Sequence, residues 1–164
     1  NTVLYTRFVE LFRIIGMDLD GVAFEDEYQA RLGQGHDLID GAMEILDYLY
    51  DKYDLYVVTN GVASTQITRL DLSGIDQYMK KIFISEEIGY QKPMKEFFYY
   101  CFERIDNLQV DKTIIIGDSL SSDILGGNNA GIKTCWFNPN GGINYTKAKV
   151  DYEIESLSEL KNIL

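Results

Sequence analysis

The chain has 164 residues, 46% of them hydrophobic, and a formal net charge of −11. Its length and composition predict one domain with a buried core and exclude disordered and fibrous proteins. The negative charge argues against nucleic acid and anionic membranes as partners, and the sequence has no apolar run of membrane-spanning length.

The first forty residues have a helical pattern. Apolar side chains recur three or four residues apart from Phe8 to Ile15, and Gly16 is a natural C-terminal stop. A second helix is expected over 22–32, with Asp20 as its N-cap. This part of the chain therefore differs from the remainder, in which strands are expected.

From residue 41 onward, strands alternate with helices. The expected strands are 55–58, 81–84, 113–116, 133–137 and 152–154. The expected helices are 41–50 with Asp40 as its cap, 64–72, 94–105 with Pro93 at the first helical position, 124–130, and a last one opened by a capping box of Ser156 and Glu159. Such alternation predicts an α/β fold, a Rossmann-like parallel sheet with flanking helices and right-handed crossovers.

The two cysteines lie in apolar surroundings. Cys101 falls in a helix-like run and Cys135 in a strand-like run. We expect both to be buried free thiols, which is typical of a reducing compartment and predicts a cytoplasmic location.

Polar side chains gather at the predicted strand ends. Thr59 and Asn60 follow one strand, Lys92 precedes Pro93, and Asp118 and Asp123 follow the run Thr113–Ile116. Ligands of open α/β sheets bind at the carboxyl ends of the strands. A hydroxyl, an amide and an ammonium are suited to bind a phosphate, and two carboxylates are suited to hold Mg²⁺ beside it. The sequence thus predicts a small phosphorylated substrate and a magnesium cofactor.

Three stretches also resemble the second, third and fourth motifs of the haloacid dehalogenase superfamily, in the same order. They are Thr59-Asn60-Gly61, residues 85–93 ending in Lys92-Pro93, and residues 116–127 with Asp118 and Asp123. The stretches 35–41, 129–131 and 134–136 resemble in particular the bacterial branch that acts on pyrimidine nucleoside monophosphates. The resemblance covers nearly the whole chain.

This resemblance implies a role for each residue. Thr59, Asn60 and Gly61 would bind the phosphoryl group, and Lys92 would tie it to the nucleophile. Asp118 would ligate Mg²⁺, with Asp123 in support. In the family, a first-motif aspartate attacks phosphorus to form an aspartyl-phosphate, and a second aspartate two residues later acts as acid and then as base. The resemblance implies a Mg²⁺-dependent phosphatase of small phosphomonoesters, specifically of nucleoside 5′-monophosphates.

The first motif has one candidate in this chain, Asp18-Leu19-Asp20. If the apolar residues before it formed a strand, the chain would be a capless phosphatase with Asp18 as nucleophile and Asp20 as acid and base. The helical periodicity before it and the N-cap character of Asp20 favour a different interpretation. Residues 6–41 resemble the second half of the family's helical cap, in which such a loop has no catalytic role.

We therefore expect residues 1–40 to be a partial helical cap and residues 41–164 to be a Rossmann-like core without its first strand. In the family this strand lies between the strand of Thr59 and the strand of Asp118, so that its absence leaves backbone groups unpaired in the core. We expect an upstream segment of the natural protein to supply the strand, the nucleophile and the first cap helices. Without it, the chain would be an inactive phosphate-binding remnant.

Other functions fit the sequence less well. Gly117-Asp118-Ser119-Leu120 also resembles a serine esterase with Ser119 as nucleophile, but the only histidine, His36, precedes the serine, contrary to that family's order. A phospho-acceptor signalling domain has its acidic pair before the threonine and the Lys-Pro pair, whereas Asp118 follows both. Removal of halide fits poorly because the Asp118 and Asp123 carboxylates are best explained by Mg²⁺.

Overall fold

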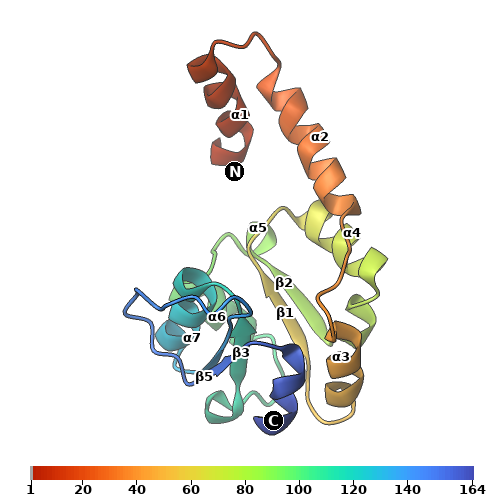
Figure 1. The fold of residues 1–164 in the computed structure, drawn as a ribbon, viewed down its shortest axis with the longest axis vertical. Coiled ribbons are helices and arrows are strands. Elements are labelled where there is room, and N and C mark those ends of the chain that lie inside the picture. Colours follow the sequence, from red (N-terminus) through yellow and green to blue (C-terminus); the bar gives the residue numbers. More distant parts are fainter. Residues whose placement is uncertain (1) are drawn as a thin grey trace.

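A computed structural model describes residues 2–164, with side chains from Thr6 onward. A hairpin of two helices stands at one end of an α/β body (Figure 1). The helices are α1 (Thr2–Ile15), α2 (Gly21–Gln34), α3 (Ala42–Tyr50), α4 (Ala63–Ser73), α5 (Ser85–Ile88), α6 (Lys95–Phe102) and α7 (Leu125–Ala130). The strands are β1 (Tyr56–Thr59), β2 (Lys81–Ile84), β3 (Ile114–Gly117), β4 (Lys133–Phe137) and β5 (Tyr152–Ile154). Short 3₁₀ or π segments are η1 (Asp76–Tyr78), η2 (Val110–Lys112), η3 (Leu120–Ile124) and η4 (Leu157–Asn162).

Aromatic packing holds the hairpin of α1 and α2 together. Phe8 and Phe12 of α1 lie edge-on to Phe24 of α2, with ring centroids 4.7 and 5.2 Å apart. Gly16 ends α1 with a φ of 71°, and Asp20 is the N-cap of α2, both as the sequence predicts. The hairpin contacts the body mainly through α2 and α4 (Figure 1).

The strands form two separate parallel sheets. β1 pairs with β2 in one, and β3, β4 and β5 pair in that order in the other. None of the residues of β1 is buried, and Ile116 in β3 is 36% exposed. Strands in the middle of a parallel sheet are normally covered on both faces. Within the described residues, β1 and β3 are each the outer strand of their own sheet.

Helices on both faces pack over the two sheets. Phe97, Phe98 and Cys101 of α6 pack with Phe83 of β2 and Ile115 of β3, so that α6 spans both sheets. On the other side, α3 and η4 cover β4 and β5 in a cluster of buried residues made up of Ile45, Leu49, Cys135, Ile154 and Leu160. This arrangement confirms the predicted α/β class with parallel strands and flanking helices.

Several predicted helix ends are wrong. The N-cap of α3 is Gly41 and not the predicted Asp40. Gly41 has a φ of 78°, in the left-handed region, where a residue with a Cβ would be strained. Pro93 is outside α6, in a turn that the Met94 N–H closes on the Gln91 carbonyl at 2.8 Å, and the Lys92–Pro93 peptide is cis. A π turn, η3, precedes α7, and the last helical segment is a 3₁₀ helix that does carry the predicted capping box.

The two cysteines are buried and free, as expected. Burial raises the pKa of the Cys101 thiol to about 12 and that of the Cys135 thiol to about 11. Both are therefore thiols rather than thiolates near neutral pH, which makes them poor nucleophiles. Within the described residues, no helix has both the length and the apolar character needed to cross a bilayer.

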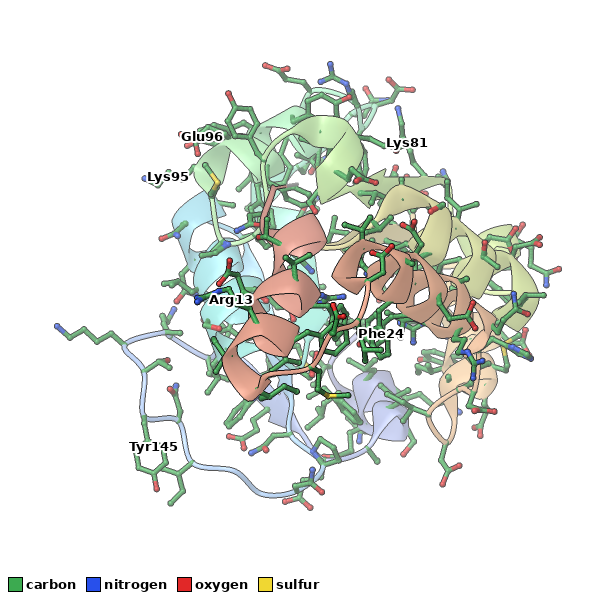
Figure 2. All side chains as sticks on the ribbon, turned by 90° about the horizontal axis from the view of Figure 1, so that it is seen from above. Arg13, Phe24, Lys81, Lys95, Glu96 and Tyr145 are labelled. Atoms are coloured by element: carbon green, nitrogen blue, oxygen red, sulfur yellow. The ribbon has the colours of Figure 1, made fainter. Side chains whose placement is uncertain are left out.

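One loop stands away from the body. Figure 2 shows Tyr145 at its tip, between β4 and β5, and this side chain is 87% exposed. The loop is closed on itself by side chains, since Asn138 bonds to the backbone of Gly142 and Asn144 bonds to Ala148. It is thus an ordered excursion from the end of β4.

Candidate active site

Lys92 joins the two sheets. Its Nζ donates to the Val58 carbonyl of β1 at 2.7 Å and to Asp123 Oδ1, in the turn after β3, at 2.6 Å. The side chains of this ion pair are 9% and 10% exposed. A buried ammonium of this kind costs desolvation energy and is stable only with such partners. The structure therefore brings the end of β1 and the turn after β3 to the same place, as the sequence predicts.

The side chain of Asn60 clamps the backbone of Lys92. Asn60 Nδ2 donates to the Lys92 carbonyl at 3.0 Å, and its Oδ1 accepts the Lys92 N–H at 2.9 Å. Both polar atoms of the amide are engaged in this pair. The side chain of Asn60 is thereby used to place Lys92, and only its backbone N–H is suited to bind a phosphoryl oxygen.

The turn after β1 is tied to the turn after β2. The Gly61 N–H donates to Ser85 Oγ at 3.2 Å, and the Ala63 N–H donates to Glu86 Oε2 at 2.8 Å. Thr59, the last residue of β1, donates from Oγ1 to Gln66 Oε1 at 3.1 Å. Sequence reasoning did not single out Ser85, Glu86 or Gln66 as site residues. No pattern in a single sequence reveals them, because their partners lie on other turns of the chain or of the helix.

Asp123 completes the turn after β3. Its Oδ2 accepts the Ser119 N–H at 3.1 Å while its Oδ1 accepts Lys92 Nζ. A Cβ on Gly117 would lie 2.4 Å from Asp123 Cγ, so that only glycine leaves room for this carboxylate. The π turn η3 carries Asp123 back over the end of β3. Asp123 is thus placed both to orient Lys92 and to neighbour any cation held by Asp118.

Asp118 presents an exposed carboxylate at the carboxyl end of β3. Its backbone carbonyl accepts the indole N–H of Trp136 at 3.0 Å, which fixes the residue without using its side chain. Carboxylate oxygens suit Mg²⁺, which usually keeps several waters and takes one or two protein carboxylates. No group of three His, Cys, Asp or Glu in the described residues is arranged to hold a metal. The Asp118 carboxylate, with Asp123 nearby, thus fits Mg²⁺ in chemical type but supplies only part of a ligand set.

The Asp18-Leu19-Asp20 stretch is not at this site. Residues 11–15 belong to helix α1, and Asp20 Oδ1 accepts the N–H groups of Val22 and Ala23, each at 3.0 Å, at the start of α2. The interpretation with Asp18 as nucleophile after a strand is therefore wrong. This segment is a helix and not a strand because its aromatic side chains have helical spacing and pack together on α2.

The two residues that a serine esterase would need, His36 and Ser119, have other partners. His36 is exposed and contacts the Gln34 carbonyl through Nδ1 at 2.7 Å. Ser119 Oγ accepts the Ser122 N–H at 3.2 Å and so caps η3. Ser119 therefore has the bonding of a helix cap, and no histidine base accompanies it.

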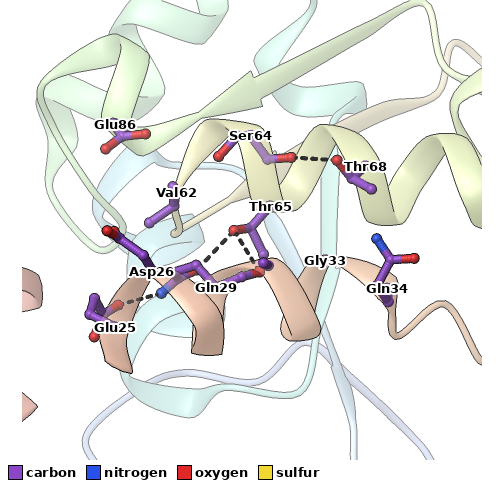
Figure 3. A pocket seen from close by; sticks show the side chains of 11 residues that line it. Glu25, Asp26, Gln29, Gly33, Gln34, Val62, Ser64, Thr65, Thr68 and Glu86 are labelled. Atoms are coloured by element: carbon purple, nitrogen blue, oxygen red, sulfur yellow. Dashed lines mark hydrogen bonds between the residues drawn. The ribbon is translucent and has the colours of Figure 1, made fainter. Parts of the chain in front are cut away.

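A cavity of about 350 Å³ lies between α2 and α4, beside the candidate site (Figure 3). Glu25 is buried on its wall and accepts hydrogen bonds from the Arg7 guanidinium and from Gln29 Nε2. The other end of the Gln29 amide, Oε1, accepts a hydrogen bond from Thr65 Oγ1 at 2.8 Å. Burial acts to raise the pKa of Glu25, but the hydrogen bonds from Arg7 and Gln29 hold it below its ordinary value of 4.5. A chain of polar bonds thus links α1 and α2 to the start of α4.

Comparisons with known proteins show the family to which the chain is similar. Residues 8–137 match the model of the haloacid dehalogenase-like hydrolases. The chain is 48% identical to YfnB of Bacillus subtilis, over 100% of its own length and 70% of YfnB. It is 42% identical to the pyrimidine 5′-nucleotidase PynA of Streptococcus pneumoniae, over 97% of its own length and 70% of PynA. A crystal structure of YfnB bound to magnesium superposes with a TM-score of 0.92, covering 99% of this chain and 72% of that one.

Proposed function

Because this chain belongs to the haloacid dehalogenase-like hydrolases, among the phosphatases of the pyrimidine 5′-nucleotidase branch, we propose that it hydrolyses nucleoside 5′-monophosphates with Mg²⁺. The observation that carries the proposal is Lys92, buried and bonded at once to β1 and to the turn after β3. An ammonium fixed in this way is ready to neutralise a phosphoryl group without reorganising. The relatives named as pyrimidine 5′-nucleotidases supply the substrate class.

In this proposal the chain's own groups bind and orient the phosphate. The Thr59 hydroxyl and the backbone N–H of Asn60 donate to phosphoryl oxygens, and Gly61 keeps the turn tight beside them. Lys92 neutralises the charge of the phosphate and is held by Asn60 and Asp123. Asp118 would hold Mg²⁺, with Asp123 in support, and the ion when bound would shield the phosphate charge from an attacking carboxylate.

We further propose that a strand from upstream of Asn1 lies between β1 and β3 and carries the attacking aspartate. It would pair with the two strand edges that the structure leaves separate. Its aspartate would form an aspartyl-phosphate, and a second aspartate two residues later would protonate the leaving oxygen and then activate water. In the same proposal, residues 1–40 are part of a helical cap and residues 41–164 are the core.

A second candidate is an inactive phosphate-binding protein. It is favoured by the incomplete metal ligand set and by the two separate sheets in the described residues. In that case Thr59 and Lys92 would bind phosphate but no group would attack it. Two free thiols favour the reducing cytoplasm as the site of either function.

The test is phosphate release from uridine 5′-monophosphate by the full natural protein, with Mg²⁺ and with excess EDTA. We expect turnover that EDTA abolishes and that added Mg²⁺ restores. Adenosine 5′-monophosphate and a sugar phosphate, assayed in parallel, define the substrate class. Binding of inorganic phosphate without turnover of any of the three would support the inactive protein instead.

A further inference from the structure

Gln66 lies directly behind the hydroxyl expected to bind phosphate. It is in the first turns of α4, and its side chain reaches back so that Oε1 accepts Thr59 Oγ1 at 3.1 Å. The backbone of this turn is fixed, since the Gln66 N–H donates to the Val62 carbonyl and the Ala63 N–H donates to Glu86. The amide of Gln66 is therefore held in place next to Thr59.

Gly61 makes room for this amide. A Cβ added there would lie 2.9 Å from Gln66 Nε2 and 3.1 Å from its Cγ. Atoms this close would push the flexible end of the Gln66 side chain away. A glycine at 61 thus lets the two ends of the Gln66 amide lie on the turn, Oε1 toward Thr59 and Nε2 toward Gly61.

The direction of the Thr59 hydrogen bond matters for binding. A threonine hydroxyl has one proton. While Thr59 donates that proton to Gln66, its oxygen can only accept, and a phosphoryl oxygen is itself only an acceptor. For Thr59 to donate to phosphate, its neighbour must stop accepting. A glutamine amide can do so, because rotation about its last side-chain bond exchanges oxygen and nitrogen in nearly the same volume.

We propose that Gln66 is a positioning residue that sets the polarity of the Thr59 hydroxyl. When phosphate binds, the amide turns, Nε2 donates a hydrogen bond to Thr59 Oγ1, and the Thr59 hydroxyl, which keeps its proton, donates a hydrogen bond to a phosphoryl oxygen. This inference rests on the proposed phosphate site but not on turnover. It requires a residue that both accepts and donates at position 66.

The test is the affinity of inorganic phosphate for the full natural protein with Mg²⁺, measured by calorimetry. In Gln66→Glu the carboxylate can only accept, so that the Thr59 hydroxyl stays turned toward it and cannot donate to phosphate. We expect the affinity for phosphate to fall by about a hundredfold. In Gln66→Met the hydroxyl is free to donate but is not oriented, and we expect a loss of about tenfold. Gln77→Glu and Gln77→Met make the same changes at an exposed glutamine near the opposite ends of the strands and should leave affinity unchanged.

The matched background is Thr59→Val, which removes the hydroxyl and nearly preserves its shape. There Gln66→Met should cost nothing further, because its effect passes through the missing hydroxyl. Gly61→Ala, which displaces the Gln66 amide, should resemble Gln66→Met and should add little to it. A structural role alone would give equal losses in both backgrounds once the folded fraction is matched by circular dichroism.

Each outcome separates this inference from the proposed function. If uridine 5′-monophosphate is hydrolysed but the Gln66→Met loss is the same in the Thr59→Val background as in the natural protein, the inference is wrong and the function stands. If nothing is hydrolysed but phosphate binding shows the expected coupling, the inference stands and the function is wrong. Equal affinities of Gln66→Met and Gln66→Glu would also overturn it, as would a protein that binds no phosphate.

Discussion

Two aspartate-containing turns in this chain look alike in sequence and differ in structure. Each begins with a glycine, Gly16 or Gly117. In each, the second aspartate accepts backbone hydrogen bonds near a helix start, from Val22 and Ala23 at Asp20 and from Ser119 at Asp123. In the first turn, Asp20 is exposed and caps α2. In the second, Asp123 is buried and paired with Lys92, which comes from a separate part of the chain.

The difference arises from what precedes each glycine. A helix leads into the first turn and delivers its aspartates to solvent between two helices. A strand leads into the second, and parallel strands end at a common edge where other segments also end. In this chain, the aspartates that follow a strand lie next to Lys92 from another segment, whereas those that follow a helix do not.

The largest expected effect comes from the same substitution in the two turns. In the proposed function Asp118 holds Mg²⁺, so that Asp118→Asn should lower kcat/KM of the full natural protein with uridine 5′-monophosphate by about 10³-fold, the loss of several kcal/mol of charge stabilisation. Asp18→Asn should leave it within about twofold. Steady-state kinetics over a Mg²⁺ series measures both. A large loss in Asp18→Asn would erase the distinction between the turns.

Lys92→Met should lower kcat/KM by about 10²-fold or more, because it removes the fixed charge that, in the proposed function, neutralises the phosphoryl group. It also leaves the Asp123 carboxylate buried without its cation, which should cost about 3 kcal/mol of unfolding free energy. The double variant Lys92→Met with Asp123→Asn should regain part of the stability and none of the activity. Lys95→Met, at an exposed lysine three residues later, is the control; comparable losses there would contradict the role of Lys92.

Asp20→Ala should destabilise the helical hairpin by about 1 kcal/mol, the usual value of an N-cap side chain. Urea unfolding measures this change, and the kcat of the purified protein should stay the same. Asp20→Asn keeps an acceptor oxygen and should retain most of the stability. A loss of turnover in Asp20→Asn greater than about tenfold would return this aspartate to the list of catalytic residues.

The smallest effect concerns pH. Because the pKa of Glu25 is lowered in the folded protein, its bond to Arg7 stabilises the protein above its ordinary pKa of 4.5 and is lost as the pH falls through the lowered value. The gap in urea midpoint between the natural protein and Glu25→Gln should therefore shrink between about pH 7 and about pH 4. Glu27→Gln removes an exposed pair with Arg31 and should show little gap at either pH. A gap for Glu25→Gln that widens in acid would contradict the lowered pKa.

Local signals in the sequence predict many element ends and miss others. Gly16 and Asp20 act on their immediate neighbours, so that their roles follow from spacing alone. Pro93 does not follow this logic: it lies in the turn before α6, next to Lys92, whose backbone is bonded to Asn60 from 32 residues away. The preference of proline for the first position of a helix therefore does not predict where α6 begins.

By itself, the sequence determined the α/β class, the order of the polar motifs and the strand ends at which Thr59 and Asp118 lie. These depend on periodicity and on residues next to one another in the chain. Periodicity before Asp18 and the N-cap character of Asp20 also predicted the junction of α1 and α2. Only the tertiary structure decided that Asn60 holds Lys92 and that Gln66 contacts Thr59. These choices depend on burial and on hydrogen bonds between distant segments, because a buried polar group is stable only where the fold brings it a partner.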